Sequence, residues 1–159
     1  MNTPEGARIA DQLRRAFYGP AWHGPALFEL LDDVDAAMAA ASPLAHVHSI
    51  WELVMHVEVW DRAAMVRLEG KKYQPTGVHN FPRVPAVTES AWHKTVAATK
   101  RTHDDLVKIV SGLSDARLRV RVPGKRYDFY HNLHGVVQHE LYHAGQIAIL
   151  KKALAAARE

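Results

Sequence analysis

Two histidines in the C-terminal part of the chain, His139 and His143, have the spacing of metal ligands on one helix. Residues four apart lie on the same helix face, one turn from each other, so their imidazoles can share one divalent ion. At about 100° per residue, apolar Val136, Ile147 and Leu150 lie within about 80° of His139. Both histidines therefore belong to the apolar stripe of the helix, and that burial has to be explained.

A third histidine, His56, has the same kind of environment in an earlier helical segment. Leu53 and Trp60 lie within about 60° of it on the helical wheel. An imidazole buried without a hydrogen-bond partner costs about 1–3 kcal/mol, and a shared ion removes that cost for three imidazoles together. The pattern favours a metal site made of His56, His139 and His143 over its alternative, a structural polar cluster.

The segment from His139 to His143 also matches H-E-x-x-H, the zinc-protease pattern in which the glutamate activates water. That interpretation requires a third ligand downstream, and the only carboxylate side chain after His143 is that of Glu159. The continuation H-x-x-G-x-x-H is also absent. The sequence therefore disfavours a protease and places Glu140 at the edge of the apolar stripe, about 100° from His139.

The other histidines are predicted to lie outside the site. Five of them have no partner at ligand spacing: His23, His79, His93, His103 and His131. His46 and His48 are predicted to lie at a helix start or at the rim of the site. His134 is predicted to be structural.

Composition limits the function classes further. The chain has 159 residues, 48% hydrophobic and 23% charged, which is typical of one soluble globular domain over residues 1–159. The net charge is only +3 and the basic residues are scattered, so nucleic acid is not an expected partner. No cysteine is present, so a metal must be held mainly by His, Asp or Glu. Neither a signal peptide nor an apolar run of about 20 residues is visible, which predicts a cytoplasmic protein without a membrane span.

The hydrophobic spacing predicts four long helical segments. The first is kinked or in two pieces, over about 4–17 and 27–41, and the others cover about 46–68, 88–112 and 128–156. Residues 70–87 form a long loop between the second and third helices, and residues 118–122 alternate like a short strand or an extended arm. Without a repeated βα pattern, an all-α four-helix bundle is the expected architecture. The 70–87 loop is expected to cover the end of the bundle from which a substrate approaches.

Three segments that span most of the chain resemble the DinB/YfiT-like superfamily. They read GPAWHGP from Gly19, HSIWELVMHV from His48 with Trp60 following, and LHGVVQHELYHAGQI from Leu133. The resemblance implies a four-helix bundle, often a homodimer, with a metal held by one histidine of the second helix and two of the last. Carried over residue by residue, those ligands are His56, His139 and His143. The family commonly has Asp or Asn where this chain has Glu140, so the role of Glu140 is open between orienting a ligand and none.

The resemblance further implies a divalent ion, zinc or nickel, with open coordination positions, as in a catalytic site. It predicts a metal-dependent hydrolase or thiol-dependent transferase acting on a small molecule. The alternatives are a metal-binding or stress-associated module without turnover, and a helical dimerisation module that binds no metal. Residues expected to support the ligands are Glu52, Glu140, Tyr142 and Gln146.

Overall fold

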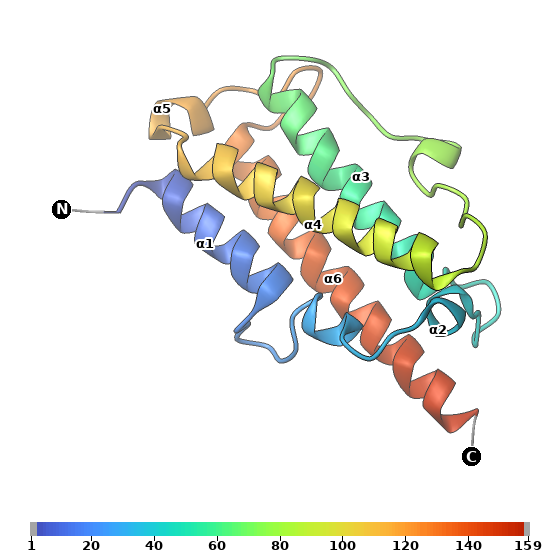
Figure 1. Cartoon of the computed structure of the whole chain (residues 1–159). Helices are drawn as coiled ribbons and strands as arrows, with labels where there is room; N and C mark the ends of the chain where they lie inside the picture. Colours follow the sequence, from blue (N-terminus) through green and yellow to red (C-terminus); the bar gives the residue numbers. More distant parts are fainter. Residues whose placement is uncertain (1–2, 158–159) are drawn as a thin grey trace.

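A computed structural model of the chain describes residues 3–157, and Glu159 lies outside them. Their regular structure is helical (Figure 1). The four long helices are α1 (Glu5–Tyr18), α3 (Ile50–Leu68), α4 (Glu89–Ser111) and α6 (Phe129–Ala156). The short elements are α2 (Ala36–Ala40), α5 (Asp115–Leu118) and 3-10 turns at Glu29–Leu31 and Gly77–His79. The predicted all-α fold is confirmed.

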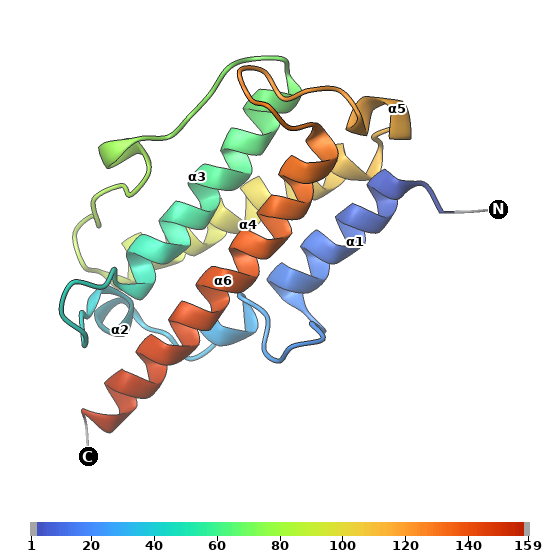
Figure 2. The same cartoon turned by 180° about the vertical axis from the view of Figure 1, so that it is seen from behind.

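The long helices form a bundle in which α1 and α3 each pack against both α4 and α6. Seen from behind, α6 lies between α3 and α1 and runs in the opposite direction to α3 (Figure 2). Trp51 and Trp92 are the largest fully buried side chains, and their ring centroids are 5.1 Å apart. No helix in residues 3–157 has both the length and the apolar character to cross a membrane.

Local capping fixes where the helices that carry the histidines begin and end. Ser49 caps α3 in a complete capping box: its hydroxyl accepts from Glu52 N, and the Glu52 carboxylate accepts from Ser49 N. Asp128 caps α6 by accepting from His131 N. Gly70 follows α3 with a φ of 87°, a conformation that stops a helix and that glycine adopts without strain. The predicted stop at Gly70 agrees with the structure.

The second half of the predicted first helix is mostly irregular. Residues 27–41 contain a 3-10 turn and the five-residue α2, because Asp35 caps α2 by accepting from Met38 N and thereby breaks the run. The apolar residues that suggested a helix are nevertheless buried: Leu27, Leu30, Leu31 and Val34. The spacing of these apolar residues correctly indicated that they are buried, but buried residues can also belong to irregular segments.

Two further predicted boundaries are wrong. Helix α3 begins at Ile50 rather than near His46, because the Ser49 cap lies three residues further on and His46 has a positive φ of 60°. The predicted extended segment 118–122 begins inside α5, and Arg121 forms only an isolated bridge with Asp128. Short alternating runs of this kind satisfy a strand pattern without making a sheet.

Candidate metal centre

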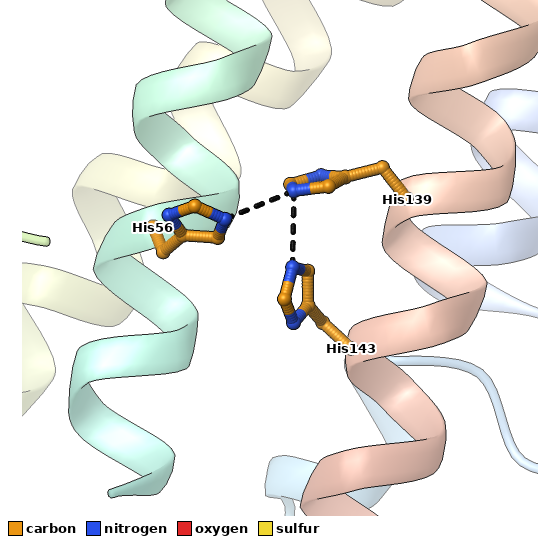
Figure 3. A group of neighbouring side chains, drawn as sticks. All are labelled: His56, His139 and His143. Carbon is orange, nitrogen blue, oxygen red and sulfur yellow. Dashed lines mark hydrogen bonds between the residues drawn. The ribbon is translucent and has the colours of Figure 1, made fainter. Parts of the chain in front are cut away.

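Three histidines converge between α3 and α6. His56 extends from α3 toward His139 and His143 of α6 (Figure 3). His139 Nε2 lies 3.0 Å from His56 Nε2 and 3.0 Å from His143 Nε2. The structure thus brings together the three residues that the sequence selected from two distant segments.

Hydrogen bonds on the outer nitrogens determine what the inner nitrogens present. His56 Nδ1 donates to the backbone oxygen of Asn80 at 2.8 Å, and His143 Nδ1 donates to Gln146 Oε1 at 2.6 Å. In each of these two neutral rings, Nε2 therefore carries no proton and presents its lone pair. A proton on His139 Nε2 can serve only one of the two, so at least one pair of lone pairs is left face to face. A divalent cation at the centre satisfies all three nitrogens.

Burial keeps the three rings in the neutral form that binds metal. It lowers the pKa of His56 to about 4 and that of His139 to about 3, and the neighbouring histidines add to both shifts. Burial also lowers the pKa of His143. At neutral pH no proton has to leave these rings before an ion binds.

The 70–87 loop holds His56 in place. Phe81 stacks on the His56 ring with 4.0 Å between centroids, and Trp60 Nε1 donates to Asn80 Oδ1 at 2.9 Å. On its other face Phe81 stacks on His48, whose predicted position at the rim agrees with this contact. The sequence predicted a long loop here, but its spacing could not show which of its residues would meet His56.

The four predicted supporting residues have different surroundings. Gln146 contacts His143 directly, and Tyr142 is 65% exposed with its ring centroid 5.1 Å from that of His143. The hydrogen bonds of Glu52 go to the start of α3, and its carboxylate also faces His48 at 3.4 Å. Glu140 points away from the three histidines into the bundle.

A cavity of about 480 Å³ adjoins the three histidines. Its wall is formed by α3, α6 and the residues just before α6: His56, Trp60, Arg67, Tyr127, His131, Asn132, Gly135, Val136, His139, Tyr142 and His143. The 70–87 loop contributes no residue to this wall, so it supports His56 from behind instead of covering the approach. That corrects the expected role of the loop.

The sequence missed a second cluster, formed by Asp61 of α3, His103 of α4 and Glu140 of α6. His103 Nδ1 lies 3.2 Å from Asp61 Oδ2 and 3.1 Å from Glu140 Oε1, and all three side chains are completely buried. We call these three residues the sealed cluster. His103 has no partner at ligand spacing in the sequence, and its two partners come from other helices, at separations that no local spacing rule covers.

Charge compensation sets the protonation of the sealed cluster. Burial alone would lower the pKa of His103, but its bonds to Asp61 and Glu140 outweigh burial and raise it to about 9. Burial raises the pKa of Glu140, and the nearby Asp61 carboxylate raises it further. Burial likewise raises the pKa of Asp61. Since Glu140 belongs to this cluster and does not line the cavity, it lacks the position that a zinc-protease glutamate requires.

Together these features define a helical-bundle protein with a candidate metal centre between two antiparallel helices. The model of the DinB superfamily matches residues 21–147, most of the chain, and the chain belongs to that superfamily. The matched region includes the three histidines and the wall of the cavity. No curated protein and no solved structure matches the chain.

Proposed function

We propose that this protein binds one divalent ion, zinc or nickel, through Nε2 of His56, His139 and His143. With that ion it acts on a small molecule as a metal-dependent hydrolase or thiol-dependent transferase. The observation that carries the proposal is the convergence of three imidazole nitrogens whose lone pairs cannot all be satisfied by one another. Membership of the DinB superfamily supports the same residues.

The protein side chains have separable tasks in this proposal. The bound ion supplies Lewis acidity, which lowers the pKa of water or a thiol and polarises a carbonyl group. Asn80 and Gln146 fix the ring orientations and tautomers of His56 and His143. Trp60 and Val136 give the neighbouring cavity an apolar wall, which limits the water around a bound molecule.

The cavity favours a reactive site over a purely structural one. Structural zinc sites generally have four protein ligands, whereas three ligands leave a position for water or substrate. A cavity large enough for a small molecule borders these three histidines. The alternative is a metal-binding or stress-associated module without turnover, in which the same ion only strengthens the contact between α3 and α6.

Metal analysis tests the binding itself. Protein purified without a histidine tag is expected to contain about one equivalent of zinc or nickel per chain, and His143→Ala is expected to lose it. His131→Ala is the matched control, because His131 lines the same cavity outside the three-histidine group. Absence of metal, with no change of melting temperature on adding either ion, would contradict the proposal.

Cobalt substitution separates the reactive site from the structural alternative. An open coordination position predicts that azide or a small thiol changes the visible spectrum of the cobalt-loaded protein. A spectrum that neither ligand changes would favour the module without turnover.

The homodimer and the cytoplasmic location stay predictions. Sedimentation of the purified chain tests the first, and fractionation of the source cells tests the second.

A further inference from the structure

We propose that the cavity binds a small molecule with a carboxylate group, held by Arg67 while the rest of the molecule extends toward the three histidines. The inference rests on the proposed function, because it assigns the ligand class of the same site. It identifies Arg67 as a specificity-determining residue.

Arg67 is a buried cation without a carboxylate partner. Its side chain lines the cavity and is 1% exposed, and no carboxylate within residues 3–157 forms an ion pair with it. A guanidinium stays charged in a protein, and burying a charge without a partner is unfavourable. Burial accordingly lowers the pKa of Arg67. An anion in the cavity provides the missing charge.

The hydrogen bonds of Arg67 leave part of its donor fork free. Nε donates to the backbone oxygen of Tyr73 at 3.0 Å, and Nη2 makes a long bond of 3.4 Å to Gln74 Oε1. Nη1 has no hydrogen-bond acceptor among the described residues. The start of the loop therefore engages Nε and Nη2, and Nη1 can donate to a carboxylate oxygen.

The cavity wall suits an anion with an apolar body. It contains no Asp or Glu in the described part of the chain, so nothing there repels a carboxylate. Trp60 lies between the two ends: its ring centroid is 5.3 Å from Arg67 Cζ and 5.7 Å from the His139 ring centroid. One indole ring thus connects the guanidinium to the histidines, and a short apolar or aromatic chain attached to a carboxylate fits along it.

Paired probes that differ only in charge test the proposal. Carboxylates from acetate to 4-phenylbutanoate, each with its neutral amide, are titrated calorimetrically into metal-loaded and into EDTA-treated protein. We expect at least one carboxylate to bind about tenfold or more tightly than its amide, since a charge-assisted hydrogen bond is formed. Arg67→Met should reduce this preference to about twofold or less, and Arg67→Lys should retain part of it.

Arg126→Gln is the matched control, because it removes a positive charge from an exposed position next to Tyr127 of the wall. It should leave the preference for carboxylates unchanged. If Arg67→Met does not fold, the reduced preference of Arg67→Lys decides.

Three outcomes would overturn the inference: no carboxylate binding better than its amide, an unchanged preference in the folded Arg67 variants, or an equal loss in Arg126→Gln. Carboxylates that bind only to metal-loaded protein, independently of Arg67, would show that the ion itself binds them. Failure of the proposed function is recognised separately, because protein without metal affinity would still show the Arg67-dependent preference after EDTA treatment.

Discussion

The three-histidine site and the sealed cluster use the same two helices to opposite effect. His139 and Glu140 are adjacent on α6, about 100° apart around its axis, so one faces the cavity and the other faces the interior of the bundle. On α3, His56 and Asp61 are divided in the same way. Buried imidazoles therefore occur in both groups, and their neighbours determine what each group can do.

The difference lies in charge compensation. In the sealed cluster, carboxylates face His103 and raise its pKa, so the protonated imidazole compensates carboxylate charge within the cluster. In the three-histidine site, no carboxylate of residues 3–157 compensates the rings, and burial lowers the pKa of each of them. The carboxylates thus keep the buried His103 ring protonated and positively charged. The three histidines that face one another stay neutral, so no positive charge lies between their nitrogens, and a metal ion would provide it.

Loss of a partner in the sealed cluster is expected to have the largest effect on stability. His103→Leu leaves two carboxyl groups facing each other in the interior, and removing one member of such a buried group costs about 3–5 kcal/mol. Urea denaturation should show this loss in the free energy of unfolding.

The matched change in the three-histidine site is His143→Ala, which also removes a mostly buried imidazole. In metal-free protein it should cost less than about 1 kcal/mol, because it borders the cavity and relieves the conflict between lone pairs. Equal losses in the two variants would contradict the division between the clusters.

Zinc should stabilise the protein through the three-histidine site alone. At a free concentration of about 100 times Kd, binding to the folded state adds about 2.7 kcal/mol to the free energy of unfolding. His56→Ala should abolish this increment, and Glu140→Gln should keep it despite a lower starting stability. An increment lost in Glu140→Gln and kept in His56→Ala would reverse the assignment of the two clusters.

Residues on a regular helix were predictable because helical geometry relates them directly. The spacing of His139 and His143, and the apolar neighbours of His56, selected the three histidines from sequence, and the family resemblance indicated the same set. The all-α architecture followed from the same periodicity. What the wheel could not supply was the angle at which one helix faces another, and that angle brings Asp61, His103 and Glu140 together.

Loop contacts were beyond prediction for a different reason. Asn80 and Phe81 reach His56 from an irregular segment whose path depends on tertiary packing. Arg67 was not singled out from the sequence, because arginine side chains are rarely buried, whereas this one lies buried against Trp60. Glu52 was expected to support a ligand because it lies one turn before His56, but its carboxylate is engaged in the capping box of α3.

Support of the ligand rings should affect metal affinity less than loss of a ligand does. Gln146→Ala removes the acceptor for His143 Nδ1 and is expected to weaken zinc binding about 10–100-fold, a typical effect for such partners. Competition with a chromophoric chelator measures the change.

Glu52→Gln is the control for that experiment, because its carboxylate caps α3 and contacts His48 instead of a candidate ligand. It should leave the zinc affinity within about twofold of the wild type while lowering stability by about 1 kcal/mol or less. A similar loss of affinity in both variants would mean that stability of the helix ends, not ring orientation, governs zinc binding.

The two clusters should also give metal-free protein opposite dependences on pH. The folded pKa of His103 is about 9, above its ordinary value of about 6.5, so its stabilisation is complete below pH 6.5 and is lost as the pH rises toward 9. The raised pKa of Glu140 acts in the same direction. The folded pKa values of His56 and His139, about 4 and 3, lie below 6.5, so their contribution is present above pH 6.5 and is lost as the pH falls toward 4.

Each proton exchanged therefore changes the free energy of unfolding by about 1 kcal/mol per pH unit: the three-histidine site loses stability as the pH falls below 6.5, and the sealed cluster loses it as the pH rises, Glu140 doing so from about pH 4.5 to 8. Urea denaturation at pH 5, 7 and 9 measures both declines. His139→Ala should flatten the acid side, because fewer buried rings remain to be protonated. Glu140→Gln should flatten the alkaline side and steepen the acid side, because the Glu140 carboxyl stabilises the fold increasingly as the pH falls from 8 toward 4.5. If His139→Ala instead changed only the alkaline side, the rings would not be neutral at pH 7, and the argument for an ion among the three histidines would fail.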